Sequence, residues 1–296
     1  MQVVLAGGSG FLGRALARAL RADGHTVVVL TRRPRGPHDA AWSGDERDRS
    51  WWPRLDGVDV VVNLAGESIA GGRWTAARKT AILQSRVAPT RAIVSAIGAA
   101  RQPPPVLLGG SAIGIYGSRG DEVLDERSST GDDFLAEVGR AWEHAAAPLR
   151  SETRLVLLRT GLVLDRAEGA LPQLALPFRF CAGGPAGTGR QYMSWIHVDD
   201  WVGLTRWAMQ EPSLRGPLNL TAPEPVTNAE FARLLGRVLH RPALLPAPAF
   251  ALRLLLGEMA DALVLGGQRV RPARALDGGF RFAYPTLVPA LQQIFD

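Results

Sequence analysis

Residues 1–13 read MQVVLAGGSGFLG, a short apolar run followed by three glycines that are each three residues apart. Gln2 to Ala6 have the composition of a buried parallel strand. The segment from Arg14 to Ala22 continues with an apolar face typical of a helix. A glycine turn between a strand and a helix is the context in which such glycines bind a dinucleotide. This stretch therefore predicts an α/β fold whose first turn holds a nucleotide cofactor.

Each glycine has a physical task in this interpretation. Gly7 lets the chain turn tightly off the strand, Gly10 lets the backbone approach a pyrophosphate, and Gly13 lets the helix lie close to the strand. The helix N-terminus supplies unpaired N–H groups and a positive dipole end to the phosphates. The alternative is a glycine-rich turn of an ordinary α/β protein. The residues of this turn that we predict to contact the cofactor are Gly7, Ser9, Gly10, Phe11 and Leu12.

The second apolar run predicts which nucleotide is bound. Thr26 to Leu30 form a β-branched strand that ends in Thr31-Arg32-Arg33, and no carboxylate follows until Asp39. A site for NAD usually places Asp or Glu there to bind the ribose 2′-hydroxyl. A guanidinium suits a 2′-phosphate, so we predict NADP(H) with Thr31 and Arg32 as contacts. The alternative is that Arg32 and Arg33 are solvated charges of an arginine-rich chain.

Strand-like and helical segments alternate along the next part of the chain. Asp59 to Asn63, Val106 to Gly109 and Arg154 to Leu158 read as strands, and Thr75 to Ala99 and Asp132 to Arg150 read as helices. This order predicts a doubly wound parallel sheet, whose ligands lie at the carboxyl ends of the strands. The segments expected around this crevice are Gly7–Gly13, Thr31–Arg32, Leu64–Gly66, Ser111–Tyr116 and Thr160–Val163.

The pattern becomes less regular after residue 165. Residues 169–194 are rich in glycine and proline, which is typical of a functional loop. A helix is expected to run through Met209 with Asp199 or Asp200 as its N-cap, and Pro217 to Thr221 resembles a last strand.

We predict two domains. Residues 1–222 form the nucleotide-binding domain, with 166–194 as an excursion on the substrate side, and 223–296 form a small helical cap. Thr227 and Glu230 form a capping-box pattern at the start of the cap. The helices expected in it are Thr227–Leu239, Pro248–Leu256 and Thr286–Phe295.

Composition narrows the function classes. The chain has 296 residues, of which 46% are hydrophobic and 21% charged, as in a globular protein. Cys181 is the one cysteine and the five histidines are scattered, so we expect neither a disulfide framework nor a metal. No apolar run is long enough to span a bilayer, and the first strand leaves no room for a signal peptide. These features predict a cytoplasmic protein without a membrane partner.

The net charge of +6 comes almost wholly from arginines, which are spread along the chain without a basic tract or an aromatic RNA-binding motif. We therefore expect no nucleic-acid partner. A small-molecule substrate is the predicted partner, and the chain is expected to be a monomer or a homodimer. Arg190, in the glycine-rich loop, suits an anionic group, so a nucleotide- or phosphate-bearing substrate is one option.

An ordered set of motifs identifies a family resemblance. The motifs are GGSGFLG (7–13), NLAGE (63–67), SAIGIYG (111–117), LRTG (158–161) and WIHVDD (195–200). Together they resemble the extended and atypical short-chain dehydrogenase/reductases, and more closely their epimerase-like subfamily. Arg73-Trp74, Ser85-Arg86 and the GGQR segment at 266–269 belong to the same resemblance.

This resemblance implies a Rossmann domain with a small C-terminal cap and NADP(H) as the ligand. It also implies that Arg86 contacts the cofactor. It does not identify the substrate. The cofactor contacts predicted beyond the first two strands are Leu64, Ala65, Gly66, Arg86 and Val163.

The catalytic residues depart from the superfamily's pattern, which places a tyrosine acid/base four residues before a lysine. None of the three tyrosines is followed in this way, and Lys79 is the one lysine of the chain. We predict Ser111 and Tyr116 as catalytic replacements, although a tyrosine at this place can equally be a wall of the pocket. Two function classes stay open: an NADP(H)-dependent oxidoreductase or epimerase, and a non-catalytic NADP(H)-binding sensor or scaffold.

Overall fold

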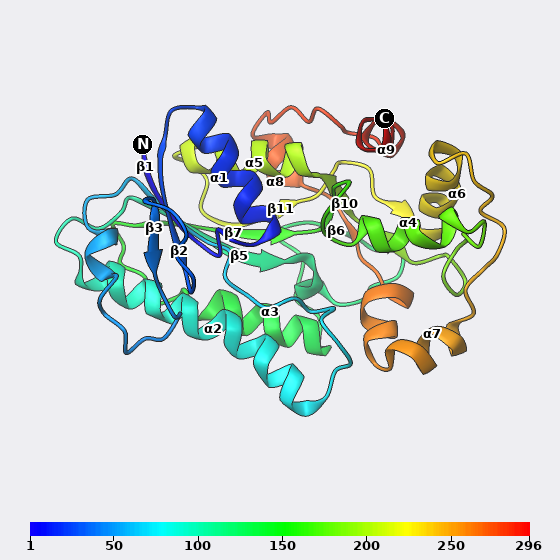
Figure 1. Cartoon of the computed structure of the whole chain (residues 1–296), viewed down its shortest axis with the longest axis horizontal. Coiled ribbons are helices and arrows are strands. Elements are labelled where there is room, and N and C mark those ends of the chain that lie inside the picture. Colours follow the sequence, from blue (N-terminus) through cyan, green and yellow to red (C-terminus); the bar gives the residue numbers. More distant parts are fainter.

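The structure, a computed structural model, describes all residues 1–296 and is built around a seven-stranded parallel sheet. The strand order is β11-β7-β5-β4-β1-β2-β3 (Figure 1). The order reverses between β1 and β4, as it does in doubly wound nucleotide-binding sheets. The predicted fold class is therefore confirmed. The strands are β1 (Gln2–Ala6), β2 (Thr26–Thr31), β3 (Asp39–Ala41), β4 (Val60–Asn63), β5 (Val106–Ala112), β7 (Arg154–Thr160) and β11 (Gly216–Leu220).

Helices cover both faces of this sheet. Figure 1 shows α1 (Phe11–Ala22) and α5 (Val198–Gln210) on one face, and α2 (Ala76–Ala99) and α3 (Phe134–His144) on the other. Successive residues of each central strand point to opposite faces. Val3 and Leu5 accordingly join the apolar cluster under α1 and α5, whereas Val4 joins the cluster under α2.

The last third of the chain is mainly helical, as expected. Two of its helices, α6 (Asn228–Val238) and α9 (Leu287–Phe295), share one apolar cluster with Trp195 and with α4 (Leu171–Arg179), which forms inside the segment predicted to be irregular. The domain boundary at residue 222 stays a prediction. The helices are α4 (Leu171–Arg179), α6 (Asn228–Val238), α7 (Ala249–Leu256), α8 (Ala273–Asp277) and α9 (Leu287–Phe295).

Three two-stranded pairs lie outside the seven-stranded sheet. None of the three appeared in the sequence reading, because strands of two or three residues leave no periodic pattern. The pairs are β8 (Leu162–Leu164) with β10 (Trp195–His197), β9 (Tyr192–Met193) with β12 (Val226–Thr227), and β6 (Val123–Leu124) with β13 (Arg269–Val270).

The helix caps give one confirmed prediction and one that was wrong. Thr227 caps α6, because its side chain accepts from the Glu230 N–H at 3.2 Å. The cap of α5 is His197, whose Nδ1 accepts from the Asp199 N–H at 3.1 Å, and is neither Asp199 nor Asp200. Asp200 is buried and instead accepts from two backbone N–H groups that precede α9. No helix of the chain has the length and apolar character to cross a membrane.

Candidate functional site

The glycine turn between β1 and α1 leaves no room for a side chain at Gly7 or Gly13. Gly7 has a φ of +77°, and a Cβ there would lie 2.6 Å from the carbonyl carbon of Leu64. A Cβ on Gly13 would overlap the carbonyl oxygen of Gly7 and lie 2.5 Å from the Cα of Gly8. The turn is therefore held tightly against both β4 and α1, in the manner predicted for these two glycines.

The N-terminus of α1 is open to an anion. Gly10 is its N-cap, no side chain bonds to the first N–H groups, and the first turn contains no acidic residue. The positive end of the helix dipole is therefore unneutralised by the protein. An α-helix in this state, preceded by a glycine turn, is suited to bind a phosphate group.

A cavity of about 620 Å³ lies in front of this turn. Eight of the twelve predicted cofactor contacts line it. These are Gly7, Ser9, Gly10, Thr31, Arg32, Leu64, Ala65 and Gly66. The other four, Phe11, Leu12, Arg86 and Val163, are not among its lining residues.

The structure places these four residues behind the cavity wall. Phe11 and Leu12 are half-buried and pack against the apolar cluster beneath α1, to which the buried Val163 of β8 also belongs. Arg86 projects from α2 and bonds to the loop after β4. A cofactor contact for these four residues stays a prediction.

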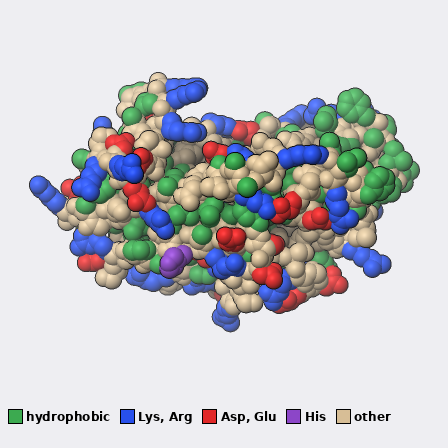
Figure 2. Space-filling view, turned by 90° about the horizontal axis from the view of Figure 1, so that it is seen from below, with side chains coloured by type: hydrophobic (Ala, Val, Ile, Leu, Met, Phe, Trp, Pro, Cys, Tyr) green, Lys and Arg blue, Asp and Glu red, His purple; other side chains and the backbone are tan.

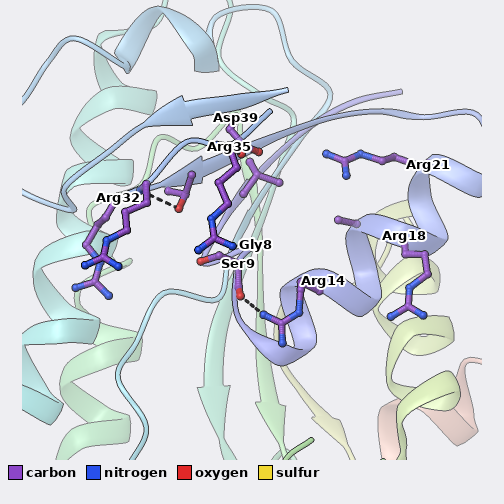
Figure 3. A pocket seen from close by; sticks show the side chains of 12 residues that line it. Gly8, Ser9, Arg14, Arg18, Arg21, Arg32, Arg35 and Asp39 are labelled. Carbon is purple, nitrogen blue, oxygen red and sulfur yellow. Dashed lines mark hydrogen bonds between the residues drawn. The ribbon is translucent and has the colours of Figure 1, made fainter. Parts of the chain in front are cut away.

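A second cavity of about 1020 Å³ adjoins the first and shares Ser9, Thr31 and Arg32 with it. Six arginines and one carboxylate line it; Figure 3 shows Arg14, Arg18 and Arg21 along α1, with Arg32 and Arg35 on the other side of the glycine turn. The carboxylate, Asp39, accepts from the backbone N–H groups of Arg35 and Gly36. The arginines are Arg14, Arg18, Arg21, Arg32, Arg33 and Arg35.

Most of these guanidinium groups have no carboxylate partner within the protein. Arg14 forms an ion pair with Glu168, whereas the other five arginines that line the cavity form no ion pair. Arg35 extends toward Ser9 in Figure 3. The sequence pattern indicated Arg32 but not Arg14, Arg18 or Arg35, because their position around one cavity depends on how α1 and β2 pack together.

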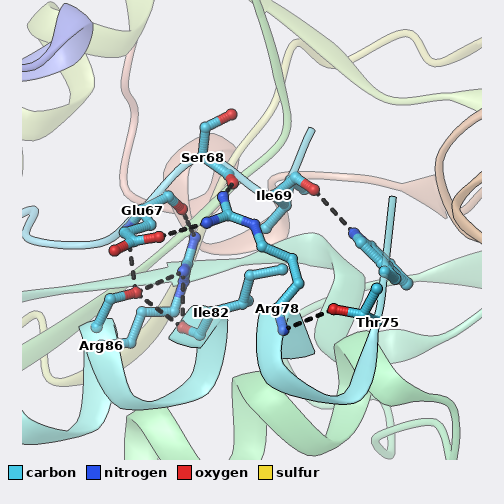
Figure 4. Close-up of polar contacts among 9 residues, drawn as sticks. Glu67, Ser68, Ile69, Thr75, Arg78, Ile82 and Arg86 are labelled. Atoms are coloured by element: carbon cyan, nitrogen blue, oxygen red, sulfur yellow. Dashed lines mark hydrogen bonds and ion pairs between the residues drawn. The ribbon is translucent and has the colours of Figure 1, made fainter. Parts of the chain in front are cut away.

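Two arginines of α2 fix the loop that follows β4 (Figure 4). Arg78 forms an ion pair with Glu67, and Arg86 donates to the Glu67 carbonyl at 2.9 Å. Arg86 also lies over the ring of Trp142, 5.1 Å from its centroid. Burial lowers the pKa of Arg86 to about 10, although the negative charge of Glu67 opposes this shift. One wall of the 620 Å³ cavity is thus preorganised.

Two lining residues of this cavity carry buried N–H groups that have no partner within the protein. They are Trp42, through its Nε1, and Arg78, through its Nε. A buried donor without an acceptor is costly, and a ligand with acceptor atoms can remove that cost. The uncapped helix, the glycine turn and these donors fit a dinucleotide. Trp42 could not be found from the sequence, because it follows β3, a strand of three residues that leaves no periodic pattern.

Ser111 and Tyr116 belong to a closed polar network at the ends of β5 and β7. Ser111 Oγ donates to Glu143 Oε1 at 2.7 Å. Arg159 donates to both Glu143 carboxylate oxygens at 2.8 and 2.9 Å and to the Tyr116 hydroxyl at 3.0 Å. The Tyr116 hydroxyl in turn donates to Asn219 Oδ1 at 2.8 Å. Every polar atom in this chain of contacts has a partner within the protein.

Burial and neighbouring charges both shift pKa values in this network. Burial raises the pKa of the Tyr116 phenol, although the nearby charge of Arg159 opposes the shift. Burial alone would lower the pKa of Arg159, but the hydrogen bonds and charge of Glu143 outweigh it and raise that pKa. Tyr116 has no exposed surface and Ser111 is 4% exposed. A catalytic role for these two residues stays a prediction, and their contacts favour a structural role.

No other residue rebuilds the missing tyrosine–lysine pair. Lys79 Nζ forms an ion pair with Glu258 at 2.6 Å and lies over the ring of Phe134. Arg190 is exposed in the loop before β9. The lysine is therefore engaged with the C-terminal region and has no tyrosine beside it.

Comparisons with known proteins identify the family. A profile of the NAD dependent epimerase/dehydratase family matches residues 3–137, and a profile of a domain of unknown function, DUF1731, matches residues 247–294. The epimerase family protein YfhF of Bacillus subtilis is 40% identical over 99% of this chain and 98% of its own length. The chain belongs to this epimerase family. Human SDR39U1, another epimerase family protein, is 38% identical over 99% of both chains.

Solved structures of relatives agree with this assignment. The crystal structure of human SDR39U1 with NADPH has a TM-score of 0.93 at 36% identity and covers 99% of both chains. A nucleoside-diphosphate sugar epimerase from Corynebacterium glutamicum has a TM-score of 0.83 at 34% identity, over 99% of this chain and 58% of that one. The resemblance inferred from the motifs of this epimerase family chain is thus confirmed.

Proposed function

We propose that this epimerase family protein binds NADP(H) at the glycine turn, with the 2′-phosphate beside Arg32. The observation that carries this proposal is the pair of adjoining cavities, which share Ser9, Thr31 and Arg32. One cavity has the glycine turn and the unpartnered donors that suit a dinucleotide. The other is lined by six arginines, where an NAD site would need a carboxylate for the ribose hydroxyls.

Charge supports the phosphorylated cofactor over NAD. A 2′-phosphate carries about two negative charges and accepts paired hydrogen bonds from a guanidinium. Arg32 is exposed at the end of β2 and forms no ion pair within the protein, so it is free to do this. The solved relative that contains NADPH shares this fold over its whole length.

The reaction we propose is oxidoreductase or epimerase chemistry on a small molecule. A bound nicotinamide supplies the hydride donor or acceptor in such chemistry. The chain would contribute the cofactor site, the ordered loop after β4 and a substrate site covered by residues 223–296. A nucleotide- or phosphate-bearing substrate would suit the exposed Arg190. The cytoplasmic localisation and the monomeric or homodimeric state of the chain stay predictions.

A second function is favoured by one specific observation. The hydroxyls of Ser111 and Tyr116 both donate to acceptors within the protein, and Arg159 occupies the Tyr116 oxygen as well. Proton transfer to a substrate would require breaking this network. NADP(H) binding without turnover, as in a redox sensor or scaffold, is compatible with the network as it stands.

The test compares NADPH and NADH binding by nicotinamide fluorescence in the wild type and Arg32→Ala. We expect the variant to lose roughly tenfold or more of its NADPH affinity, because a charge-assisted bidentate contact is removed. The affinity for NADH should change little. Arg127→Ala, which removes an exposed arginine outside both cavities, is the matched control. Equal losses for the two cofactors would refute the 2′-phosphate assignment.

A further inference from the structure

Large hydrophobic side chains are exposed mainly at one end of the molecule. Nine are exposed in the whole chain, and seven of them lie in two short segments, 176–180 and 244–255. The two others are Met1 and Val123. We call the seven the cap-end patch: Leu176, Phe180, Leu244, Leu245, Phe250, Leu254 and Leu255. Such clustering marks an interaction surface, because single exposed apolar residues are otherwise scattered.

Backbone hydrogen bonds join the second segment to the loop that follows the first. The Leu245 N–H donates to the Gly183 carbonyl at 3.1 Å, and the Ala247 N–H donates to the Pro185 carbonyl at 2.8 Å. The loop after α4 therefore runs beside the linker that leads into α7. In Figure 2, hydrophobic side chains gather at the right-hand end of the molecule, the end where Figure 1 places α6, this linker and α7.

The helix α7 is unusual because all of its residues except Arg253 are apolar and none of them is buried. A helix of this composition normally lies in a protein core or in a membrane. Phe250 and Leu254 are one turn apart and are 74% and 77% exposed. Arg73 bonds to the carbonyls of Leu254 and Leu255, so the helix is anchored to the protein while half of its side chains, including that of Phe250, are exposed.

The segments that carry the patch contain arginines and no carboxylates. No Asp or Glu occurs between Glu168 and Asp199 or between Glu230 and Glu258. The arginines in these two intervals are Arg179, Arg190, Arg233, Arg237, Arg241 and Arg253. Three of the acidic groups next to them are paired: Glu230 lies 3.8 Å from Arg233, Glu258 pairs with Lys79, and Asp261 pairs with Arg253.

We propose that the cap-end patch docks on an anionic lipid surface. Apolar side chains that insert at the headgroup boundary, together with nearby arginines that attract anionic lipids, are the features of peripheral membrane binding. A second copy of the chain fits less well, because two segments with the same positive charge would face each other. A protein partner usually fills pockets, whereas side chains as exposed as Leu244, at 81%, stand out from the surface.

This docking lies along the surface and needs no spanning segment. The sequence-based expectation of no membrane partner rested on the absence of a long apolar run, which concerns spanning alone. It is independent of cofactor binding, because the patch residues line neither of the two cavities beside the glycine turn.

The experiment is co-sedimentation of the full chain with two kinds of vesicle, phosphatidylcholine alone and phosphatidylcholine mixed with phosphatidylglycerol. We expect binding to the mixed vesicles that weakens as salt is added, because the arginine contribution is screened. Phe250→Glu with Leu254→Glu should lower the bound fraction roughly tenfold or more. Val123→Glu is the matched control, since it changes an exposed hydrophobic residue outside the patch and should leave binding intact.

A second variant does not touch the apolar residues. Arg241→Glu should weaken binding to the anionic vesicles, whereas Arg127→Glu, on an exposed surface elsewhere, should weaken it much less. Unchanged NADPH affinity would show that each variant is folded. Absence of vesicle binding by the wild type, or equal loss with the control variants, would overturn the proposal. A concentration-dependent dimer abolished by the Phe250/Leu254 variant, seen by light scattering, would assign the patch to a second copy instead.

Discussion

At the ends of β1 and β2, the N–H groups of α1 and several arginines are open to solvent, and few have partners within the protein. At the ends of β5 and β7, a few strands away along the same edge, Ser111, Tyr116, Glu143 and Arg159 bond to one another. The first region has the free donors that an anionic ligand needs. The second is a buried network in which the protein satisfies its own groups.

This contrast separates two properties that enzymes of this fold usually combine. Binding a cofactor requires donors that are preorganised and unpaired, as the glycine turn and Arg32 are. Proton transfer requires a group that can reach the substrate, and the Tyr116 hydroxyl is fully buried between Arg159 and Asn219. The donors that would bind a cofactor are thus open to a ligand, while the residues expected to do chemistry are closed within the protein.

The largest expected effect tests the closed region. Arg159→Ala leaves Glu143 partly buried without its bidentate partner, and Tyr116 loses one donor. We expect the free energy of unfolding to fall by about 3–5 kcal/mol, because a buried charge is left uncompensated. Denaturant unfolding measures this loss.

A matched arginine provides the control. Arg119 forms an ion pair with Glu122 that is much more exposed than the Arg159–Glu143 pair, so Arg119→Ala should cost less than about 1 kcal/mol. Similar losses for the two variants would show that the network is not the buried, cooperative unit described above.

The next effect tests the open region. Gly7→Ala places a methyl group against the backbone of Leu64 at a positive φ, whereas Gly24→Ala meets a similar φ of +80° with no atom within 4 Å. Both variants share a backbone penalty of about 1 kcal/mol. Gly7→Ala should cost about 1–3 kcal/mol more by the same unfolding assay and should also weaken NADPH binding. Equal stability of the two variants would mean that the turn adapts to a side chain.

The sequence predicted the open region better than the closed one. Strand, glycine turn and helix follow one another within twenty-two residues, so local pattern identified the turn, and eight of the twelve predicted cofactor contacts line the cavity. The closed network joins residues far apart in the sequence, such as Tyr116 and Asn219, with a separation of 103 residues. The sequence alone does not show whether a hydroxyl or carboxylate group bonds to solvent or to another residue of the protein.

Short strands and helix caps were also not predicted, because they too depend on partners that are distant in the sequence. Asp199 or Asp200 was expected to cap α5, but the ring of His197 accepts the capping hydrogen bond. Asp200 instead accepts hydrogen bonds from backbone N–H groups that precede α9, more than eighty residues later in the sequence. The arginines of α1 join those after β2 around one cavity only after the helix has packed on the sheet.

A smaller effect separates structure from catalysis at Tyr116. Tyr116→Phe removes the acceptor of Arg159 and the donor to Asn219, which should cost about 1–3 kcal/mol of unfolding free energy. Tyr284→Phe is the control, because the Tyr284 hydroxyl makes no hydrogen bond within the protein while its ring packs on His197. If a substrate is turned over, an unchanged rate in Tyr116→Phe would remove Tyr116 as the acid.

The smallest effect is a dependence on alkaline pH. Burial raises the pKa of Tyr116, so its phenol keeps its proton in the folded protein at a pH where an unfolded tyrosine, with a pKa of about 10, begins to lose it. Between these two pKa values the unfolded chain binds fewer protons, so stability falls as pH rises, by at most about 1.4 kcal/mol per pH unit. The Tyr116→Phe variant should not show this part of the loss of stability at alkaline pH. Urea unfolding of both proteins on either side of pH 10 measures it, and parallel pH profiles would mean that the Tyr116 phenol ionises as freely in the fold as in the unfolded chain.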